Sequence, residues 1–359
     1  MKKGRISAAR KALAIAVAIG SALLCAWPMN SAASASSSQD QRLGGRARPV
    51  ITLQWPQFFG AGNEKSRDSA PRVLIPGGRA IGVAIRTQGV LVVGAGDNGR
   101  DSLREGDMIL SVNGVPLLES AMLTEAVNAA QGQPLSLRIS RSGQESDLLL
   151  TPRYDESSRA WRLGVWVRDS TAGVGTLTYY DPATGAYGAL GHAITDSDTG
   201  SLLPVREGAL MQAEIVDVRR GQRGAPGELR GSFLREQVTL GTVLVNTVFG
   251  IYGHLDAPTA SALYPEGLPT ASRGQVHTGA ATILSTIAGQ EACEYAIEIT
   301  QVSRQSAAAP KSMVLRVTDE RLLSSTGGIV QGMSGSPILQ DGRIVGAVTH
   351  VFVSDPTQG

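Results

Sequence analysis

Short runs of β-branched or alternating apolar residues, separated by glycines, fill the chain from residue 161 onward and constrain its fold more than any other feature. The runs lie at 163–167, 174–179, 210–218, 239–252, 295–302 and 313–317. Such spacing is typical of an antiparallel barrel or sandwich. The 43 glycines and only 4% aromatic residues also favour short strands joined by tight turns over helical bundles. We therefore predict a mainly β protein with a β domain at 160–359.

The region 71–153 predicts a smaller β-rich domain with one helix. Strands are expected at 81–85, 90–93, 108–112, 135–139 and 148–151, and a helix at 118–130. A turn glycine, Gly106, an acidic residue, Asp107, and an alternating apolar run precede the turn Asn113-Gly114. This arrangement resembles a PDZ domain, although the same residues also suit a plain β-hairpin with an Asn-Gly turn.

Ile81, Gly82 and Val83 resemble the carboxylate-binding loop of a PDZ domain. In such a loop, consecutive backbone N–H groups bind the terminal carboxylate of a peptide, and the neighbouring strand edge pairs with the peptide. The resemblance therefore implies a peptide ligand at these three residues. The loop lacks the usual aromatic residue, so a terminal carboxylate is less firmly indicated than the fold.

The first 38 residues have the order of charge, apolar run and small side chains that marks an export signal. Five basic residues, all between positions 2 and 11, precede a 16-residue apolar run at 12–27. That run is shorter than the roughly 20 residues that span a bilayer comfortably, so cleavage near Ala33 or Ala35 and retention as an anchor both stay open. Either outcome places the rest of the protein outside the cytoplasm. Residues 39–70 are polar, without a sustained period, and predict a linker.

Charge and cysteine content exclude several classes of function. Without the five N-terminal basic residues, 28 basic groups face 31 acidic ones, a net charge of −3, so nucleic acid is not an expected partner. Cys25 lies in the apolar run and would leave Cys293 alone, so no disulfide framework is predicted. The four histidines are spread over 158 positions without metal-ligand spacing, and we predict neither a metal nor another cofactor.

The strongest chemical motif surrounds Ser334, which lies between Gly332-Met333 and Gly335-Ser336. A serine flanked by glycines can expose its hydroxyl on a tight turn, and the backbone N–H groups of Gly332 and Ser334 can form an oxyanion hole. An ordinary Gly/Ser turn is the alternative. The following hairpin, with its turn at 340–343, favours a nucleophile loop like that of trypsin-like serine peptidases, with Met333 and Ser336 replacing the usual Asp and second Gly.

A serine nucleophile needs a base, and the residues alone leave more than one candidate. His192 and His254 both lie in glycine-edged segments where a turn could present the ring to a cleft. His350 alternates with apolar neighbours, which favours a structural role on a strand, and His277 is uninformative. For an orienting acid, Asp319 ends an expected strand 15 residues before Ser334, a position that also suits a turn cap.

A combination of motifs resembles the SpoIVB serine peptidases of endospore-forming bacteria. The motifs are Leu-Gly-His-Ala-Ile at 190–194, Lys-Ser-Met-Val at 311–314, Val-Thr-Asp-Glu at 317–320 and Gly-Ile-Val-Gln-Gly-Met-Ser-Gly-Ser-Pro at 328–337. The resemblance implies that His192 is the general base, Asp319 the orienting carboxylate and Ser334 the nucleophile. It also implies a barrel fold related to the chymotrypsin-like clan, although the separations of 127 and 15 residues differ from those of ordinary trypsin-like enzymes. Members usually continue a little further, so a terminal strand is expected after Gly359.

The resemblance further implies a signalling role in sporulation. Family members are exported from the forespore into the intermembrane space. There they cleave the regulatory subunit of a membrane-embedded protease complex that controls sigma-factor activation, and they also cleave themselves near the N-terminus.

Two other functions compete with this reading of the sequence. The first is an exported PDZ adaptor without chemistry, which the intact Ser334, His192 and Asp319 oppose. The second is a general envelope quality-control protease, which the domain order opposes, because in those enzymes the PDZ domain follows the catalytic domain.

Overall fold

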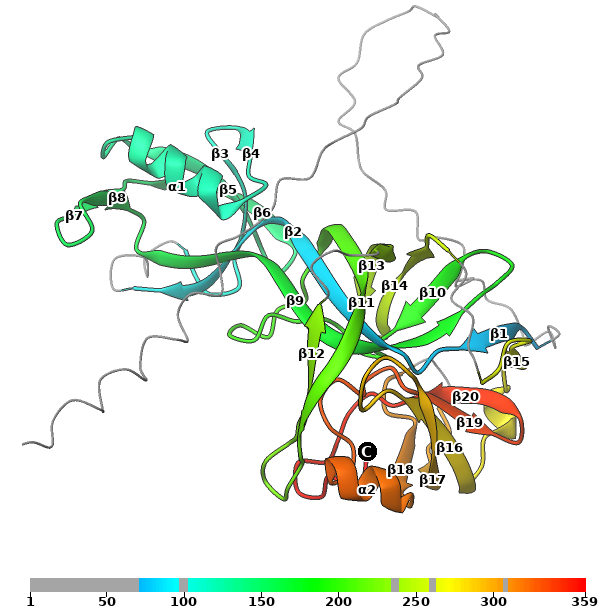
Figure 1. Cartoon of the computed structure of the whole chain (residues 1–359). Coiled ribbons are helices and arrows are strands. Elements are labelled where there is room, and N and C mark those ends of the chain that lie inside the picture. The colour runs from blue at the N-terminus through cyan, green and yellow to red at the C-terminus, as the bar shows by residue number, and fades with distance from the viewer. Residues whose placement is uncertain (1–70, 97–102, 234–238, 258–262, 306–308) are drawn as a thin grey trace, which may run out of the picture. The chain divides into compact units, whose positions relative to one another are not determined.

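The computed structural model describes residues 71–96, 103–233, 239–257, 263–305 and 309–359. The predicted export segment at 1–38 and the predicted linker at 39–70 lie outside these residues. The described chain is mainly β, as expected, with two α-helices (Figure 1). None of the described helices is long and apolar enough to cross a membrane.

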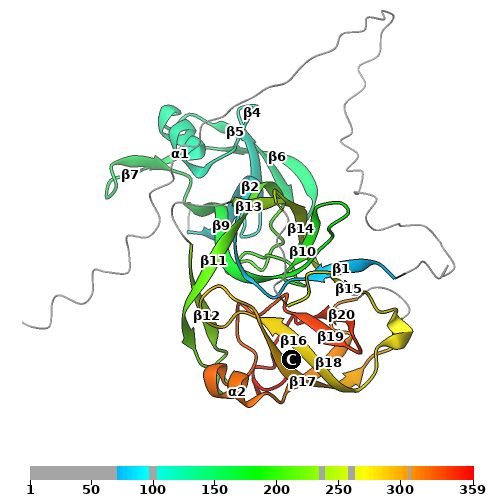
Figure 2. The ribbon, with the colours of Figure 1, turned by 45° about the vertical axis from the view of Figure 1, so that its right-hand side comes forward.

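Six strands pair in a closed ring, because the pairings that lead from β9 through β10, β14, β13 and β11 to β2 return from β2 to β9 (Figure 2). The ring strands are β2 (Ala80–Ala95), β9 (Val165–Tyr180), β10 (Ala186–Ala189), β11 (Val205–Arg219), β13 (Thr239–Thr247) and β14 (Gly250–Leu255). Their inward residues form one core that includes Ile81, Val83, Ile85, Tyr187, Leu210 and Ile251. Three further strands extend the ring: β1 (Val73–Pro76) pairs with β9, β15 (Leu268–Pro269) pairs with β1, and β12 (Glu228–Phe233) pairs with β11.

A separate five-stranded antiparallel sheet forms the C-terminal part of the chain. Its strands follow the order β18 (Met313–Val317), β17 (Cys293–Val302), β16 (Gly279–Ser285), β19 (Pro337–Gln340) and β20 (Arg343–Ala347). The helix α2 (Glu320–Thr326) and the short 3-10 helix η1 (Arg273–Gln275) belong to the same part. One apolar core joins this sheet to β11 and β12, since Ile215 and Leu229 pack with Ile283, Ile297 and Met333. The serine motif lies between α2 and β19 and is therefore held by this core.

A third core organises the region that resembles a PDZ domain. It contains β3 (Met108–Val112), β4 (Val115–Pro116), α1 (Ser120–Ala129), β5 (Leu135–Arg141) and β6 (Gln144–Leu150), together with the second half of β2. In α1, Leu123 and Val127 lie one turn apart and are buried. The hairpin of β7 (Arg153–Asp155) and β8 (Ala160–Arg162) adds Trp161, whose ring meets Tyr154 edge to face at 5.4 Å.

Strand pairing divides the chain differently from the predicted boundary at 153. β1 and the first half of β2, which fall within 71–153, pair with β9 and β11. The expected strands at 81–85 and 90–93 are one continuous strand in the structure. Gly89, which lies between the two expected strands, permits a close approach: an added Cβ would lie 2.6 Å from the Ile109 carbonyl oxygen.

Candidate active site

The loop around Ser334 is tight because both flanking glycines adopt left-handed backbone conformations. The φ angles of Gly332 and Gly335 are +96° and +99°. Met333 is fully buried and anchors the loop in the C-terminal core, while its N–H donates to the Val330 carbonyl oxygen at 3.1 Å. The Ser334 hydroxyl is half-buried and donates to the carbonyl oxygen of Thr349 at 3.2 Å. The loop therefore forms a tight turn at Ser334, with the hydroxyl half-buried and hydrogen-bonded to Thr349.

The backbone N–H groups in this loop fall into two sets. Those of Gly335 and Ser336 donate to the carbonyl oxygens of Val348 and Met333, at 2.7 and 3.0 Å. Within the described residues, the N–H groups of Gly332 and Ser334 donate to no acceptor. These two are the N–H groups that the sequence assigned to an oxyanion hole. Donors that no internal carbonyl uses are available for a developing oxyanion.

His192 lies in a strained turn that follows β10. Leu190 and Gly191 both have left-handed backbones, with φ angles of +71° and +70°, and Leu190 is buried. An apolar side chain in this conformation costs about 1–2 kcal/mol, and such strain is often found at functional sites. The Leu190 side chain occupies the space beside Gly175, where an added Cβ would lie 2.0 Å from its Cδ2. The turn is therefore fixed by packing before the imidazole is presented.

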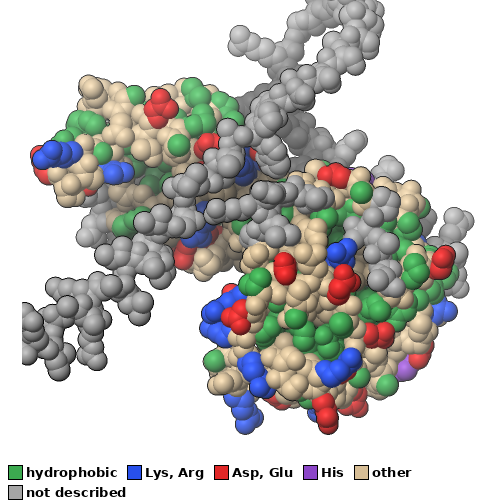
Figure 3. All heavy atoms as spheres, viewed as in Figure 1, with side chains coloured by type: hydrophobic (Ala, Val, Ile, Leu, Met, Phe, Trp, Pro, Cys, Tyr) green, Lys and Arg blue, Asp and Glu red, His purple; other side chains and the backbone are tan. Residues whose placement is uncertain are grey.

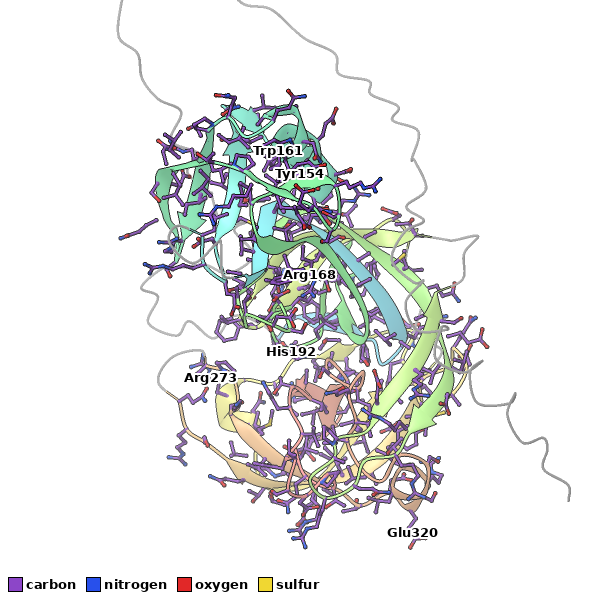
Figure 4. The ribbon with its side chains drawn as sticks, turned by 90° about the vertical axis from the view of Figure 1, so that its left-hand side faces the viewer. Tyr154, Trp161, Arg168, His192, Arg273 and Glu320 are labelled. Atoms are coloured by element: carbon purple, nitrogen blue, oxygen red, sulfur yellow. The ribbon has the colours of Figure 1, made fainter. Side chains whose placement is uncertain are left out.

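The His192 ring has a defined tautomer in this geometry. Its Nδ1 lies 2.8 Å from the carbonyl oxygen of Ala193, and a carbonyl oxygen can only accept. The proton therefore resides on Nδ1, and Nε2 of the neutral ring has a free lone pair for base catalysis. Figure 4 shows His192 where the ring strands meet the C-terminal sheet.

Thr349 contacts both halves of the site. Its carbonyl oxygen accepts the hydrogen bond from Ser334, and its Cγ2 lies 2.9 Å from where a Cβ on Gly191 would stand. The next residue, His350, has its ring 5.9 Å from the ring of His192, measured between centroids. Desolvation, and then the charges of Lys311 and His192, lower the pKa of His350. The structure thus brings Ser334 and the His192 turn to one segment.

The segment after His192 is anchored by a buried carboxylate. Asp196 is almost fully buried. Its carboxylate accepts hydrogen bonds from the Arg168 guanidinium, from the N–H and the hydroxyl of Thr199, and from the N–H of Asp198. Arg168 lies on β9, below the PDZ-like core in Figure 4, and it also donates to the Asp198 carboxylate at 2.8 Å. A charged side chain on the long strand β9 therefore holds the segment that begins four residues after His192.

Asp319 is engaged elsewhere. It is the N-cap of α2, and its carboxylate accepts from the N–H of Arg321 at 2.9 Å, from the Arg321 guanidinium at 2.8 and 3.0 Å, and from the N–H of Ala296 at 3.2 Å. The Arg321 side chain holds the pKa of this carboxyl well below its usual range. Among the described residues, none of its hydrogen bonds reaches His192. The structure places Asp319 as the turn cap that the sequence offered as the alternative.

The other three histidines have different positions: His254 and His277 lie apart from the candidate site, and His350 lies beside His192. His254 lies on β14, and His277 pairs with Asp341 at 2.8 Å between Nε2 and the carboxylate. His350, expected on a strand, follows the end of β20 and lies outside any strand. Its alternation with apolar neighbours gave no signal that its ring would meet His192.

The prediction of a carboxylate-binding loop at Ile81, Gly82 and Val83 is wrong. These residues lie within β2 and are paired on both sides, with 173–175 of β9 and with 210–212 of β11. Ile81 and Val83 are also buried in the core of the ring. A peptide cannot add to a strand whose two edges are already paired, so no ligand binds there by β-addition.

Comparison with known proteins decides the family. The family described as SpoIVB peptidase S55 matches residues 159–359, which include Ser334, His192 and Asp319. The chain belongs to this family. The protein is therefore a serine peptidase, a hydrolase of peptide bonds. No curated protein matches the chain.

One solved structure similar to a part of this SpoIVB-type chain is the PDZ domain of an SdrC-like protein from Listeria monocytogenes. It is 16% identical, covers 22% of this chain and 87% of its own, and has a TM-score of 0.21.

Proposed function

We propose that the protein is an exported serine endopeptidase of sporulation signalling. Its substrate would be the regulatory subunit of a membrane-embedded protease complex that controls sigma-factor activation, and it would also cleave itself near its own N-terminus. The place of action would be the intermembrane space, reached from the forespore with or without retention of the N-terminal anchor. Membership of the SpoIVB peptidase family supports this proposal.

One observation carries the catalytic part of the proposal: the two N–H groups beside Ser334 have no internal acceptor among the described residues, in a loop that shares Thr349 with the His192 turn. Ser334 Oγ would attack the peptide carbonyl as Nε2 of His192 takes its proton. The N–H groups of Gly332 and Ser334 would bind the oxyanion. His192 would then return the proton to the leaving amine, and water would repeat the sequence to release the acyl group.

The assignment of Asp319 as the orienting carboxylate rests on its motif. In the structure its oxygens bind the α2 terminus and Arg321, and the Ala193 carbonyl oxygen holds the His192 tautomer. Asp319→Asn separates the two roles. A fall in kcat of roughly 10⁴ with recovery at high pH is the result for an orienting carboxylate. A change of less than about tenfold is the result for a cap, since Asn caps helices about as well as Asp.

The partners would be proteins. The face in Figure 3 has interspersed acidic and basic side chains. The described residues also include the exposed ion pairs Arg230–Asp217 and Arg219–Glu228. The PDZ-like region would bind a peptide of the membrane-bound partner, at a place other than the paired strand at 81–83.

The test uses the full chain with a segment of a candidate membrane-protein substrate. Ser334→Ala and His192→Ala should each remove cleavage, with a loss on the order of 10⁴ or more, because members of such a unit do not act additively. His277→Ala is the matched control, since His277 is exposed and pairs with Asp341, and it should keep most activity. Cleavage that persists in Ser334→Ala would end the proposal. Binding without cleavage by the unaltered chain would favour the adaptor.

A further inference from the structure

Thr176 on β9 is a buried polar residue whose three hydrogen-bonding groups all contact the candidate site. It is only 1% exposed. Its N–H donates to the carbonyl oxygen of Ser334 at 3.1 Å, and its hydroxyl donates to the carbonyl oxygen of Gly332 at 2.8 Å. Its own carbonyl oxygen accepts from the N–H of Leu190 at 3.2 Å. Thr176 therefore makes two hydrogen bonds to the loop around Ser334 (the nucleophile loop, residues 332–335). It makes one more to the turn that carries His192 (the base turn, residues 190–192).

The two bonds to the nucleophile loop fix the orientation of its peptide groups. Because each peptide group is planar, holding the carbonyl oxygens of Gly332 and Ser334 fixes the planes on either side of the peptide group that contains the Ser334 N–H. The Ser334 N–H therefore lies between two peptide groups that Thr176 holds in place. Among the described residues this Ser334 N–H donates to no acceptor, so the peptide group between the two that Thr176 holds carries one of the donors assigned to the oxyanion hole.

The third bond extends this control to the base. Leu190 lies two residues before His192, and its N–H is held by the carbonyl oxygen of Thr176. The contact is close-packed as well as hydrogen-bonded. A Cβ on Gly335 would stand 2.2 Å from the Thr176 carbonyl oxygen and 2.6 Å from the Leu190 nitrogen. The nucleophile loop and the base turn therefore meet on the backbone of Thr176.

We propose that Thr176 is a positioning residue, which orients the oxyanion N–H of Ser334 and the turn of His192 without touching the substrate. This inference rests on the proposed roles of Ser334 and His192. The hydroxyl is the part that can be removed alone. Its loss leaves the half-buried Gly332 carbonyl oxygen without this partner, and a partly buried acceptor without a donor favours a conformation in which it finds another hydrogen bond. The loop would then rotate out of the conformation that presents its free N–H groups.

The test compares Thr176→Val, which removes the hydroxyl and keeps the shape, with Thr176→Ser, which keeps the hydroxyl, in the full chain. The matched control is Thr178→Val, because Thr178 lies on the same strand and its buried hydroxyl makes no hydrogen bond with any described residue. For a peptide substrate we expect kcat of Thr176→Val to fall roughly 10²-fold, the scale of losing one oxyanion donor, with KM little changed. The kcat values of Thr176→Ser and Thr178→Val should stay within about threefold of the kcat of the unaltered chain.

Each outcome bears on one proposal. If Thr176→Val has the kcat of Thr178→Val while Ser334→Ala is inactive, Thr176 has only a structural role and the inference fails. If Ser334→Ala is as active as the unaltered chain, the proposed function fails instead. If Thr176→Val does not fold by circular dichroism, Thr176→Cys replaces it, because a thiol is a weaker donor. An intermediate kcat of that variant supports the inference, and an unchanged kcat overturns it.

Discussion

Replacing Gly335 by alanine tests the packing between the nucleophile loop and the ring. The left-handed φ of +99° costs a non-glycine residue about 1–2 kcal/mol. The new Cβ would also meet the backbone oxygen of Thr176 at 2.2 Å, and relieving such overpacking costs about 1–3 kcal/mol more. We expect Gly335→Ala to lose about 2–5 kcal/mol of unfolding free energy in total. A shift of about 1 Å in the Ser334 loop should also lower kcat roughly 10²-fold.

Gly342→Ala is the control, measured by urea unfolding and by peptide hydrolysis. Gly342 has a φ of +69° and no atom within 4 Å of an added Cβ, so this variant has the backbone strain without the clash. It should lose only about 1–2 kcal/mol and keep its kcat. If the two variants unfold within about 0.5 kcal/mol of each other, the predicted overpacking is absent. The close contact of Gly335 with Thr176 would then not exist in solution.

Two further predictions concern titrating groups. Asp319→Asn should lower the unfolding free energy by about 1 kcal/mol at neutral pH, through loss of the ion pair with the exposed Arg321. Because the folded pKa of Asp319 is depressed, this difference should be present above a pH of about 4 and vanish as the pH falls through the folded pKa; a difference that persists at low pH would refute it. By NMR, His277 should titrate above the ordinary value of about 6.5, because the Thr278 carbonyl oxygen and then Asp341 stabilise its charged form. Asp341→Asn should lower the pKa of His277. An unchanged titration would show that the contact between His277 and Asp341 does not exist in solution.

Periodicity predicted some elements closely, whereas the expected strands at 163–167 and 174–179 are one strand, β9, in the structure. The expected helix at 118–130 is α1 (Ser120–Ala129), and the expected strand at 108–112 is β3. The long strand β2 could not be predicted, because Gly89 reads as a turn residue, and only tertiary contact with Ile109 reveals a close approach. The paired position of Ile81–Val83 was hidden for a related reason, since sequence patterns do not tell which strands will flank a β run.

The site was partly predictable. The glycines around Ser334 favour the tight turn that carries it, and both have the left-handed backbone that glycine adopts most easily. The contribution of Thr176 could not be inferred, because it lies 156 residues from Gly332 and only the fold joins them. Asp319 begins a helix that the sequence analysis did not expect, and a capping carboxylate and an orienting carboxylate are the same residue type.

The long strands β2 and β9 belong to two cores at once. Leu91 and Val92 of β2 pair with Arg168 and Val167 of β9 beside the PDZ-like core, and the same two strands continue into the ring. A fragment that begins at residue 159, where the family region starts, would lack β1 and β2 and leave β9 and β11 each with an unpaired edge. Exposed edges of this kind recruit other chains and aggregate. The region 159–359 therefore depends on two strands that precede it, and any evolutionary exchange of the residues before 159 must conserve β1 and β2.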